Sequence, residues 1–223
     1  MKKLKVIGIP VLLCLLMVFT SAKTADKQTE KLDDAAKVLK EFGKMKEEIP
    51  HDLISECQGI VIVPNLINAG IGIGGKRGRG VAIVKLDNGS WSDPVFVTLT
   101  GGSIGPQIGI QSVDLVLVFR HKGVLTEVKR GDVTIGGDAS AAAGPVGRST
   151  SANTDYKAEA EIYSYSRSRG LFAGISINGS SLAIDNAANN AFYGDDATAQ
   201  EIFAGAKNHS ASVKNLKSAL SDL

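Results

Sequence analysis

A glycine-rich segment with three basic residues is the part of the sequence closest to a phosphate-binding motif. Residues 70–80 match G-x-G-x-x-G from Gly70 and also most of the P-loop pattern G-x-x-x-x-G-K, which would end at Lys76. Both motifs hold phosphate at the N-terminus of a helix that begins directly after the loop. Here residues 81–84 are apolar and predict a strand, and Arg77 replaces the Ser or Thr of a P-loop. The pattern argues against nucleotide binding and favours glycine-rich strands that bend or pack closely.

The same segment carries a compact cluster of cations, Lys76, Arg77 and Arg79. Ammonium and guanidinium groups bind phosphate through charge-assisted hydrogen bonds, and guanidinium does so with a planar pair of donors. We expect these side chains to form a basic tip that can meet the phosphate of a lipid head group. A solvated turn without a ligand is the alternative for such a cluster.

A second short motif, residues 101–105, matches the G-x-S-x-G nucleophile elbow of serine hydrolases. The elbow places its serine, here Ser103, between a strand and a helix. The residues after the motif are β-branched and glycine-rich and do not predict a helix. A triad would also need a later acid and a later histidine, for which the sequence offers His121 and His209. A serine hydrolase centred on Ser103 is therefore an alternative only, and we do not expect an enzyme.

Residue types that bind metals are sparse. The three histidines are scattered, and no Cys–His cluster exists. Asp185, Asp195 and Asp196 lie among asparagines and could form an oxygen-ligand patch. Helix capping explains Asp185 and Asp195 more simply. We expect neither a metal nor a cofactor.

Residues 1–22 have the plan of a secretory signal peptide. Lysines at the start precede an apolar run over residues 6–20, and small residues follow where a signal peptidase cuts. The run of about fifteen residues is shorter than the ~20 that cross a bilayer as a helix, which disfavours a membrane anchor. Leu13 precedes Cys14, whereas a lipoprotein signal has a small residue there. We expect export to the periplasm or the outside, with a possible peripheral position on a membrane.

Removal of this leader changes the charge. The chain has 25 basic and 23 acidic residues, and residues 1–22 hold three lysines and no acid, which leaves 22 basic and 23 acidic residues. So small a net charge gives no field that would steer the protein to nucleic acid. Cys57 then stays as a lone cysteine, which cannot close an intrachain disulfide. Its apolar neighbours predict a buried, inert thiol.

Helices are predicted at both ends of a run of strands. Apolar residues recur at three- and four-residue steps over 26–49, which predicts an amphipathic helix, and a short helix is expected over 51–57. Strands are predicted over 60–63, 81–86, 91–100, 108–120, 157–169, 171–177 and 181–184, with hairpin turns at 87–89 and 178–179. Helices are expected again over 187–193, 197–206 and 210–223. Residues 132–155 are rich in Gly, Ala and Ser and give no clear prediction.

This order of elements predicts an α+β fold: a curved, mostly antiparallel β-sheet or partial barrel, flanked by N-terminal and C-terminal helices. Strands and helices do not alternate, which disfavours a doubly wound parallel sheet. A mature chain of about 200 residues can bury one core. We therefore expect one domain at 23–209, followed by a helical tail at 210–223.

Several longer motifs resemble the SYLF domain family. The similar segments are residues 74–81, 91–94, 105–114, 144–148, 163–166, 170–179 and 189–194. They lie in order over about residues 30–205, so the resemblance is far more specific than the short motifs above. It implies a lipid-binding module and not an enzyme; eukaryotic members bind phosphoinositides and, in some cases, actin filaments.

The resemblance also implies lipid contacts through a basic amphipathic helix that opens the domain. The matching residues here are Lys37, Lys40, Lys44 and Lys46. With the basic tip, they predict an exported protein that binds anionic phospholipid or phosphoinositide head groups on a membrane surface. Actin is expected as a partner by resemblance alone, and a structural envelope protein without a ligand is the further alternative.

Overall fold

The computed structural model describes most of the chain after the expected leader. The described residues are 26–45, 49–121, 123–125, 128, 132–144, 160–168, 171–172, 176–205, 208 and 210–223. The expectations for the leader, Lys46 and His209, and for the start of the strand predicted from residue 157, lie outside them. Among the described helices, none combines the length and the apolar character needed to cross a bilayer.

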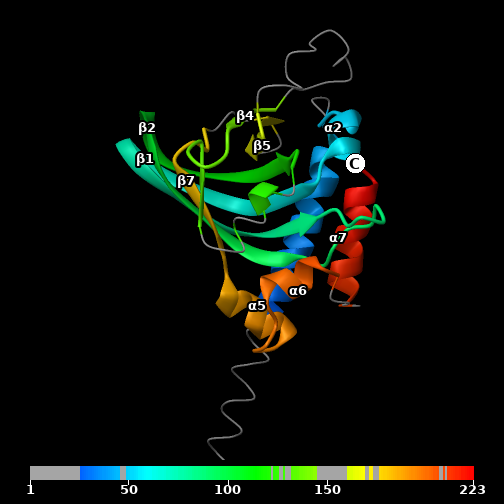
Figure 1. Ribbon diagram of the computed structural model, residues 1–223. Coiled ribbons are helices and arrows are strands. Elements are labelled where there is room, and N and C mark those ends of the chain that lie inside the picture. The colour runs from blue at the N-terminus through cyan, green and yellow to red at the C-terminus, as the bar shows by residue number, and fades with distance from the viewer. Residues whose placement is uncertain are drawn as a thin grey trace, which may run out of the picture.

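Two long strands form the centre of a seven-stranded sheet. β1 (Gly59–Val84) and β2 (Val95–Phe119) pair antiparallel over almost their whole length. The shorter strands are β3 (Val133–Ile135), β4 (Ala141–Ala143), β5 (Ile162–Ser168), β6 (Leu171–Phe172) and β7 (Ser180–Ile184). The order is β3-β7-β2-β5-β4, with β1 on β2 and β6 on β5, and β4 is parallel to β5. The predicted α+β fold with a curved, mostly antiparallel sheet is confirmed (Figure 1).

β1 folds back on itself near residues 70–74. A Cβ atom on Gly80 would lie 2.0 Å from the carbonyl oxygen of Ile62, and one on Gly74 would lie 2.2 Å from that of Ala69. The β1–β2 register shifts at the same place, between Ile71 and Ile73. The two strands therefore bend together. The bend in the middle of the two strands forms a tip, residues 67–75 of β1 with 102–112 of β2, which projects away from the helices (Figure 1). We call it the ribbon tip.

The extent of β1 corrects the prediction of a strand that ends at residue 63, before Pro64. β1 continues through Pro64, with a register shift between Val63 and Leu66 and a positive φ of 52° at Asn65. A bulge of this kind tolerates a residue that cannot donate a ladder hydrogen bond. The segments predicted as 60–63 and 81–86 consequently belong largely to one strand.

Helices cover one face of the sheet. They are the helix over residues 26–42, α2 (His51–Glu56), α5 (Asn186–Tyr193) and α7 (Ala211–Ser221). Leu39 and Phe42 of the first helix share a buried cluster with Ile62 and Val118 of the sheet and with Leu216 of α7. The helix predicted over 26–49 ends at 42, before a turn at Gly43. The predicted C-terminal helix forms, and its apolar side packs into this cluster.

A second buried cluster fills the other face of the sheet. It joins apolar residues of β1 and β2 to β3, β7 and α6 (Ala199–Phe203). The hairpin predicted between 171–177 and 181–184 is wrong, because β6 pairs with β5, whereas β7 pairs with β2 and β3. The turn at Gly179 does form, with φ of 74°, and its N–H donates to the carbonyl of Ile135 in β3. This contact docks the turn on β3.

Candidate functional site

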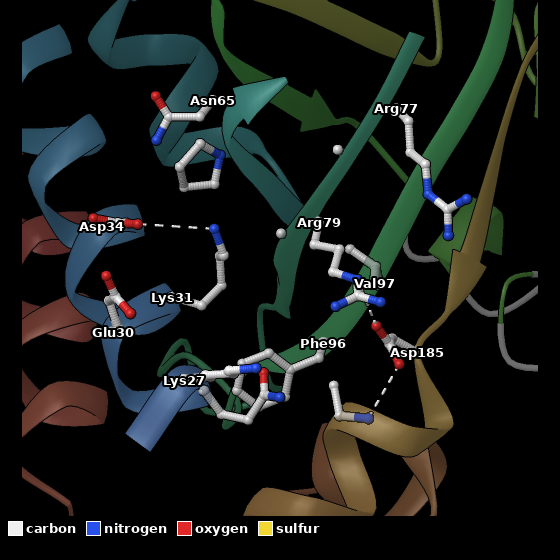
Figure 2. Close-up of a pocket in the computed structure, with 15 residues that line it drawn as sticks. Lys27, Glu30, Lys31, Asp34, Asn65, Arg77, Arg79, Phe96, Val97 and Asp185 are labelled. Carbon is white, nitrogen blue, oxygen red and sulfur yellow. Dashed lines mark hydrogen bonds and ion pairs between the residues drawn. The ribbon is translucent and has the colours of Figure 1, made fainter. Parts of the chain in front are cut away.

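An open cleft of about 540 Å³ lies between the helix 26–42 and the second half of β1. Figure 2 shows the side chains around it. The charged residues that line it are Lys27, Glu30, Lys31, Asp34, Arg77, Arg79 and Asp185. Apolar atoms of Phe96, Val97 and Ala188 complete the lining. The cleft is thus a polar surface site on an apolar base.

Strand alternation brings the two arginines into the cleft. Arg77 and Arg79 are exposed on one face of β1, while Gly78 and Gly80 are buried on the opposite face. That opposite face lies against the first half of the same strand, where a Cβ on Gly78 would be 2.5 Å from Val63 Cγ1. The alternating Arg-Gly-Arg-Gly sequence therefore has a structural cause on each side. The glycines permit the close approach, and the arginines take the outer face.

Arg79 is tied loosely to the start of α5. Its Nε lies 3.6 Å from Asp185 Oδ2, and the two side chains are 67% and 15% exposed. Asp185 is also the N-cap of α5, accepting a hydrogen bond of 3.1 Å from the N–H of Ala188 (Figure 2). The capping role expected for Asp185 is confirmed. The one expected for Asp195 is wrong, because Thr198 caps α6 through a reciprocal pair with Glu201.

The other cations of the cleft differ in how far they are neutralised. Lys31 forms an ion pair of 3.8 Å with Asp34, one turn further along the helix. Arg77 and Lys27 form no ion pair with any carboxylate among the described residues. Exposed pairs of this kind contribute at most about 1 kcal/mol, so an incoming anion can displace them. Arg77 is the guanidinium most available to an anionic ligand.

The structure does not bring Lys76 together with Arg77 and Arg79. Neighbouring residues of a strand point to opposite faces, so the side chain of Lys76 is buried, with 6% exposure. Its Nζ donates to the backbone carbonyl of Ser176, and burial lowers the pKa of the ammonium. The expected compact basic tip is therefore wrong in its geometry. Two arginines face the cleft from within a strand, and Lys76 lies on the buried face of that strand.

The lysines expected to bind lipid from the opening helix lie outside the cleft lining. Lys37 and Lys40 are exposed on the helix, and Lys44 is exposed in the turn after it. Exposed acids, among them Glu30 and Asp33, occupy the earlier part of the same helix. Acids near a helix N-terminus and cations near its C-terminus complement the helix dipole. This distribution accounts for the lysines without a ligand.

Lys27 and Lys31 are cleft residues that sequence reasoning missed. They stand one helical turn apart, at i and i+4, so they share a side of the helix. The i, i+4 spacing of these two lysines was the signal available in the sequence to identify them. It could not select them from the other lysines of the helix, because the side that faces β1 is decided by packing.

The hydrolase and metal alternatives gain no support from the described residues. The backbone of Ser103 lies within β2, paired with Gly74, and the strand continues after it, so the strand-to-helix elbow is absent there. His121 follows the C-terminal end of that strand. The described residues contain no group of three His, Cys, Asp or Glu side chains placed to hold a metal. Cys57 is buried, as expected, and burial raises its pKa to about 11.

Comparison with known proteins gives a consistent match. Residues 100–223 match the family model Ysc84, described as "Las17-binding protein actin regulator". The chain is 37% identical over 179 residues to SH3 domain-containing YSC84-like protein 1 of Xenopus laevis, covering 77% of this chain and 53% of the relative. It is 35% identical over 180 residues to LAS seventeen-binding protein 3 of Saccharomyces cerevisiae, covering 77% and 39%. The chain thus spans about half, or less, of the length of these relatives.

Proposed function

The chain belongs to the Ysc84 family, whose domain is also called SYLF, and on this premise we propose that it is a non-catalytic protein that binds anionic lipid head groups. The observation that carries the proposal is the open cleft in which Arg77, without an ion pair among the described residues, lies two positions from Arg79. Lys27 and Lys31 line the opposite wall. A lipid phosphate between these walls would meet donors from both sides.

The arrangement suits a phosphate better than a carboxylate-rich protein surface. Arg77 can donate two parallel hydrogen bonds to one phosphate. Arg79 can exchange its long contact with Asp185 for a second phosphate oxygen. The three carboxylates of the lining, Glu30 and Asp34 on the helix and Asp185 beside Arg79, repel further anions. A single head group is consequently the ligand that the charges accommodate.

Binding of this kind is weak and depends on salt. A cation near an anionic membrane surface contributes about 1 kcal/mol, and this falls off within a Debye length of about 8–10 Å. Neutralising both arginines therefore removes about 2 kcal/mol, a loss of about thirtyfold in affinity.

The test is co-sedimentation of residues 23–223 with vesicles of phosphatidylcholine alone and of phosphatidylcholine with phosphatidylglycerol, at several salt concentrations. We expect binding to the anionic vesicles that declines as salt rises. Arg77→Gln with Arg79→Gln should remove it, whereas Lys37→Gln with Lys40→Gln, an equal change of charge outside the cleft, should reduce it much less. Equal losses in the two double variants would contradict a site in the cleft, and no binding to either vesicle would contradict the lipid function.

We also propose that the protein is exported, on the basis of the pattern in residues 1–22. Expression of the full chain in a bacterium with a periplasm, followed by intact mass measurement, tests this. The expected product begins at residue 23 and is recovered outside the cytoplasm. Recovery of the uncleaved chain in the cytoplasm would exclude the leader function.

A second candidate partner follows from the names of the relatives. The family model is described as an actin regulator, and the yeast relative is named for binding to LAS seventeen. Because this chain matches only 39–53% of the length of these relatives, their partners can depend on parts that the match does not include. Co-sedimentation with filamentous actin, with and without anionic vesicles, tests whether the domain alone has this partner.

A further inference from the structure

The ribbon tip presents large apolar side chains to solvent. Ile71, Ile73 and Ile110 are 79%, 78% and 78% exposed, and Ile67 is 43% exposed. In the β1–β2 register, Ile110 of β2 pairs with Ala69, which lies two positions before Ile71 in β1. Contiguous apolar surface of this kind marks a binding surface for a protein or a membrane.

A fifth exposed apolar side chain lies beside the tip. Leu171 is 74% exposed and pairs with Ser168 at the end of β5. The hydroxyl of Ser168 donates to the carbonyl of Ser112 in β2 at 3.4 Å. All the large apolar side chains that are exposed in the described part of the chain therefore lie on or beside the ribbon tip.

The two strands that form this tip carry more cations than acids. β1 contains no Asp or Glu, and the acid in β2, Asp114, is held by Arg167 at 2.6 Å. Ile71, Ile73, Arg77 and Arg79 occupy alternate positions of β1 and are all exposed on the same strand face. At about 3.3 Å per residue, Arg77 lies about 13 Å behind Ile73. One face of the strand thus runs from an apolar end to a cationic band.

We propose that the ribbon tip inserts Ile71, Ile73 and Ile110 among the acyl chains of an anionic bilayer while Arg77 and Arg79 bind lipid phosphates at the surface. This inference rests on the proposed lipid-binding function and assigns it an inserting element. The head-group layer on each side of a bilayer is about 5–8 Å thick, so an inclined strand of about 13 Å spans it. Insertion of apolar side chains combined with attraction of cations to anionic lipid is the physical basis of interfacial binding.

The charge pattern favours a bilayer over the other occupants of such a surface. A second copy of the chain would bring two cationic bands into proximity when two tips meet, with no carboxylate on either ribbon tip to offset them. An anionic bilayer offers both an apolar interior and phosphates, in the order in which the strand presents isoleucine and arginine.

The test labels the tip with an environment-sensitive fluorophore. Ile71→Cys in residues 23–223 carries the label, and Asn88→Cys, exposed in the turn that connects β1 to β2, is the matched control. Native Cys57 is buried and stays unlabelled while the protein is folded. With vesicles of phosphatidylcholine and phosphatidylglycerol, we expect a blue shift at position 71 and quenching by acyl-chain spin labels, and neither at position 88.

A second variant separates insertion from surface binding. Ile71→Ser with Ile73→Ser should leave the salt-sensitive binding in place and reduce the binding that persists at high salt by roughly tenfold. Sedimentation with anionic vesicles but no shift at position 71 would overturn the insertion and leave the proposed function standing. Absence of sedimentation would overturn the proposed function itself. Dimers in solution that the double serine variant abolishes would assign the tip to a second copy and overturn the inference.

Discussion

Arg79 and Asp185 face each other at the edge of the cleft, with the Arg79 Nε atom 3.6 Å from Asp185 Oδ2. The carboxylate of Asp185 serves two purposes, because it also caps α5. A phosphate that binds Arg79 has to replace this carboxylate without uncapping the helix. Different substitutions of Asp185 can therefore separate the effect on fold stability from the effect on ligand affinity.

Asp185→Asn should tighten lipid binding with little loss of stability. Asparagine caps a helix about as well as aspartate, so the free energy of unfolding should change by less than about 0.5 kcal/mol. Removal of the charge frees Arg79, so affinity for anionic vesicles should rise several-fold. Urea unfolding and co-sedimentation measure the two effects. Asp185→Ala, which removes the cap as well, should cost about 1 kcal/mol; weaker lipid binding by the asparagine variant would contradict the role given to Arg79.

Gly80→Ala should disrupt the fold, whereas Gly102→Ala should be tolerated. The new Cβ on residue 80 would lie 2.0 Å from the carbonyl oxygen of Ile62, a backbone atom that cannot move aside. The cost should be about 3 kcal/mol or more. Gly102 also lies in a long strand, and no atom lies within 4 Å of the corresponding position there. Denaturant unfolding of the two variants compares them directly, and equal stabilities would show that the two halves of β1 are not in contact.

The fold was predictable where local patterns and packing agree. The α+β class, the Asp87–Gly89 hairpin turn and the helices near both ends follow from periodicity and turn residues. The continuity of β1 was not predictable, because Pro64 and the glycines are strand-breaking signals locally. Their compatibility with a strand depends on the bulge at Asn65 and on the contact of Gly80 with Ile62. Such non-local contacts leave no periodic signal.

The candidate site was predictable in part. The Arg77–Arg79 pair could be selected from the sequence because two cations at alternate positions share one face of a strand. Lys76 was grouped with them by proximity in sequence, but the same alternation places it on the buried face. The contribution of Lys27 and Lys31 depends on how the helix packs beside β1, which the sequence does not specify.

Arg167 should be important for stability. Its guanidinium, 13% exposed, bonds Asp114 at 2.6 Å and Glu41 at 3.0 Å, and so links β5, β2 and the helix 26–42. Arg167→Met leaves Asp114, 17% exposed, without its counter-ion, which should cost about 2–4 kcal/mol.

Lys214→Met, on the exposed side of α7, is the control for this change and should stay within about 0.5 kcal/mol of the wild type. Asp114→Asn added to Arg167→Met should recover part of the loss. A loss below about 1 kcal/mol in urea unfolding would mean that the network adds no more than a surface ion pair.

Lys76→Met should give a variant whose stability relative to the wild type depends on pH. Burial lowers the pKa of the Lys76 ammonium from its ordinary value of 10.5, and no described carboxylate pairs with it. At pH values between the lowered pKa of Lys76 in the folded protein and its ordinary pKa in the unfolded chain, the folded state binds fewer protons than the unfolded state. Wild-type stability therefore rises with pH across that range, a rise that methionine cannot produce.

At about pH 7 we expect Lys76→Met to be as stable as the wild type or more stable, because an apolar side chain of similar length replaces a buried charge. The carbonyl of Ser176 loses its donor, but Ser176 is exposed and water can replace it. As the pH rises toward the ordinary pKa of 10.5, the wild type should gain on the variant. Urea unfolding at several pH values, with Lys214→Met as the exposed control, measures this. A difference that does not change with pH would mean that the ammonium of Lys76 is as well solvated in the folded protein as in the unfolded chain.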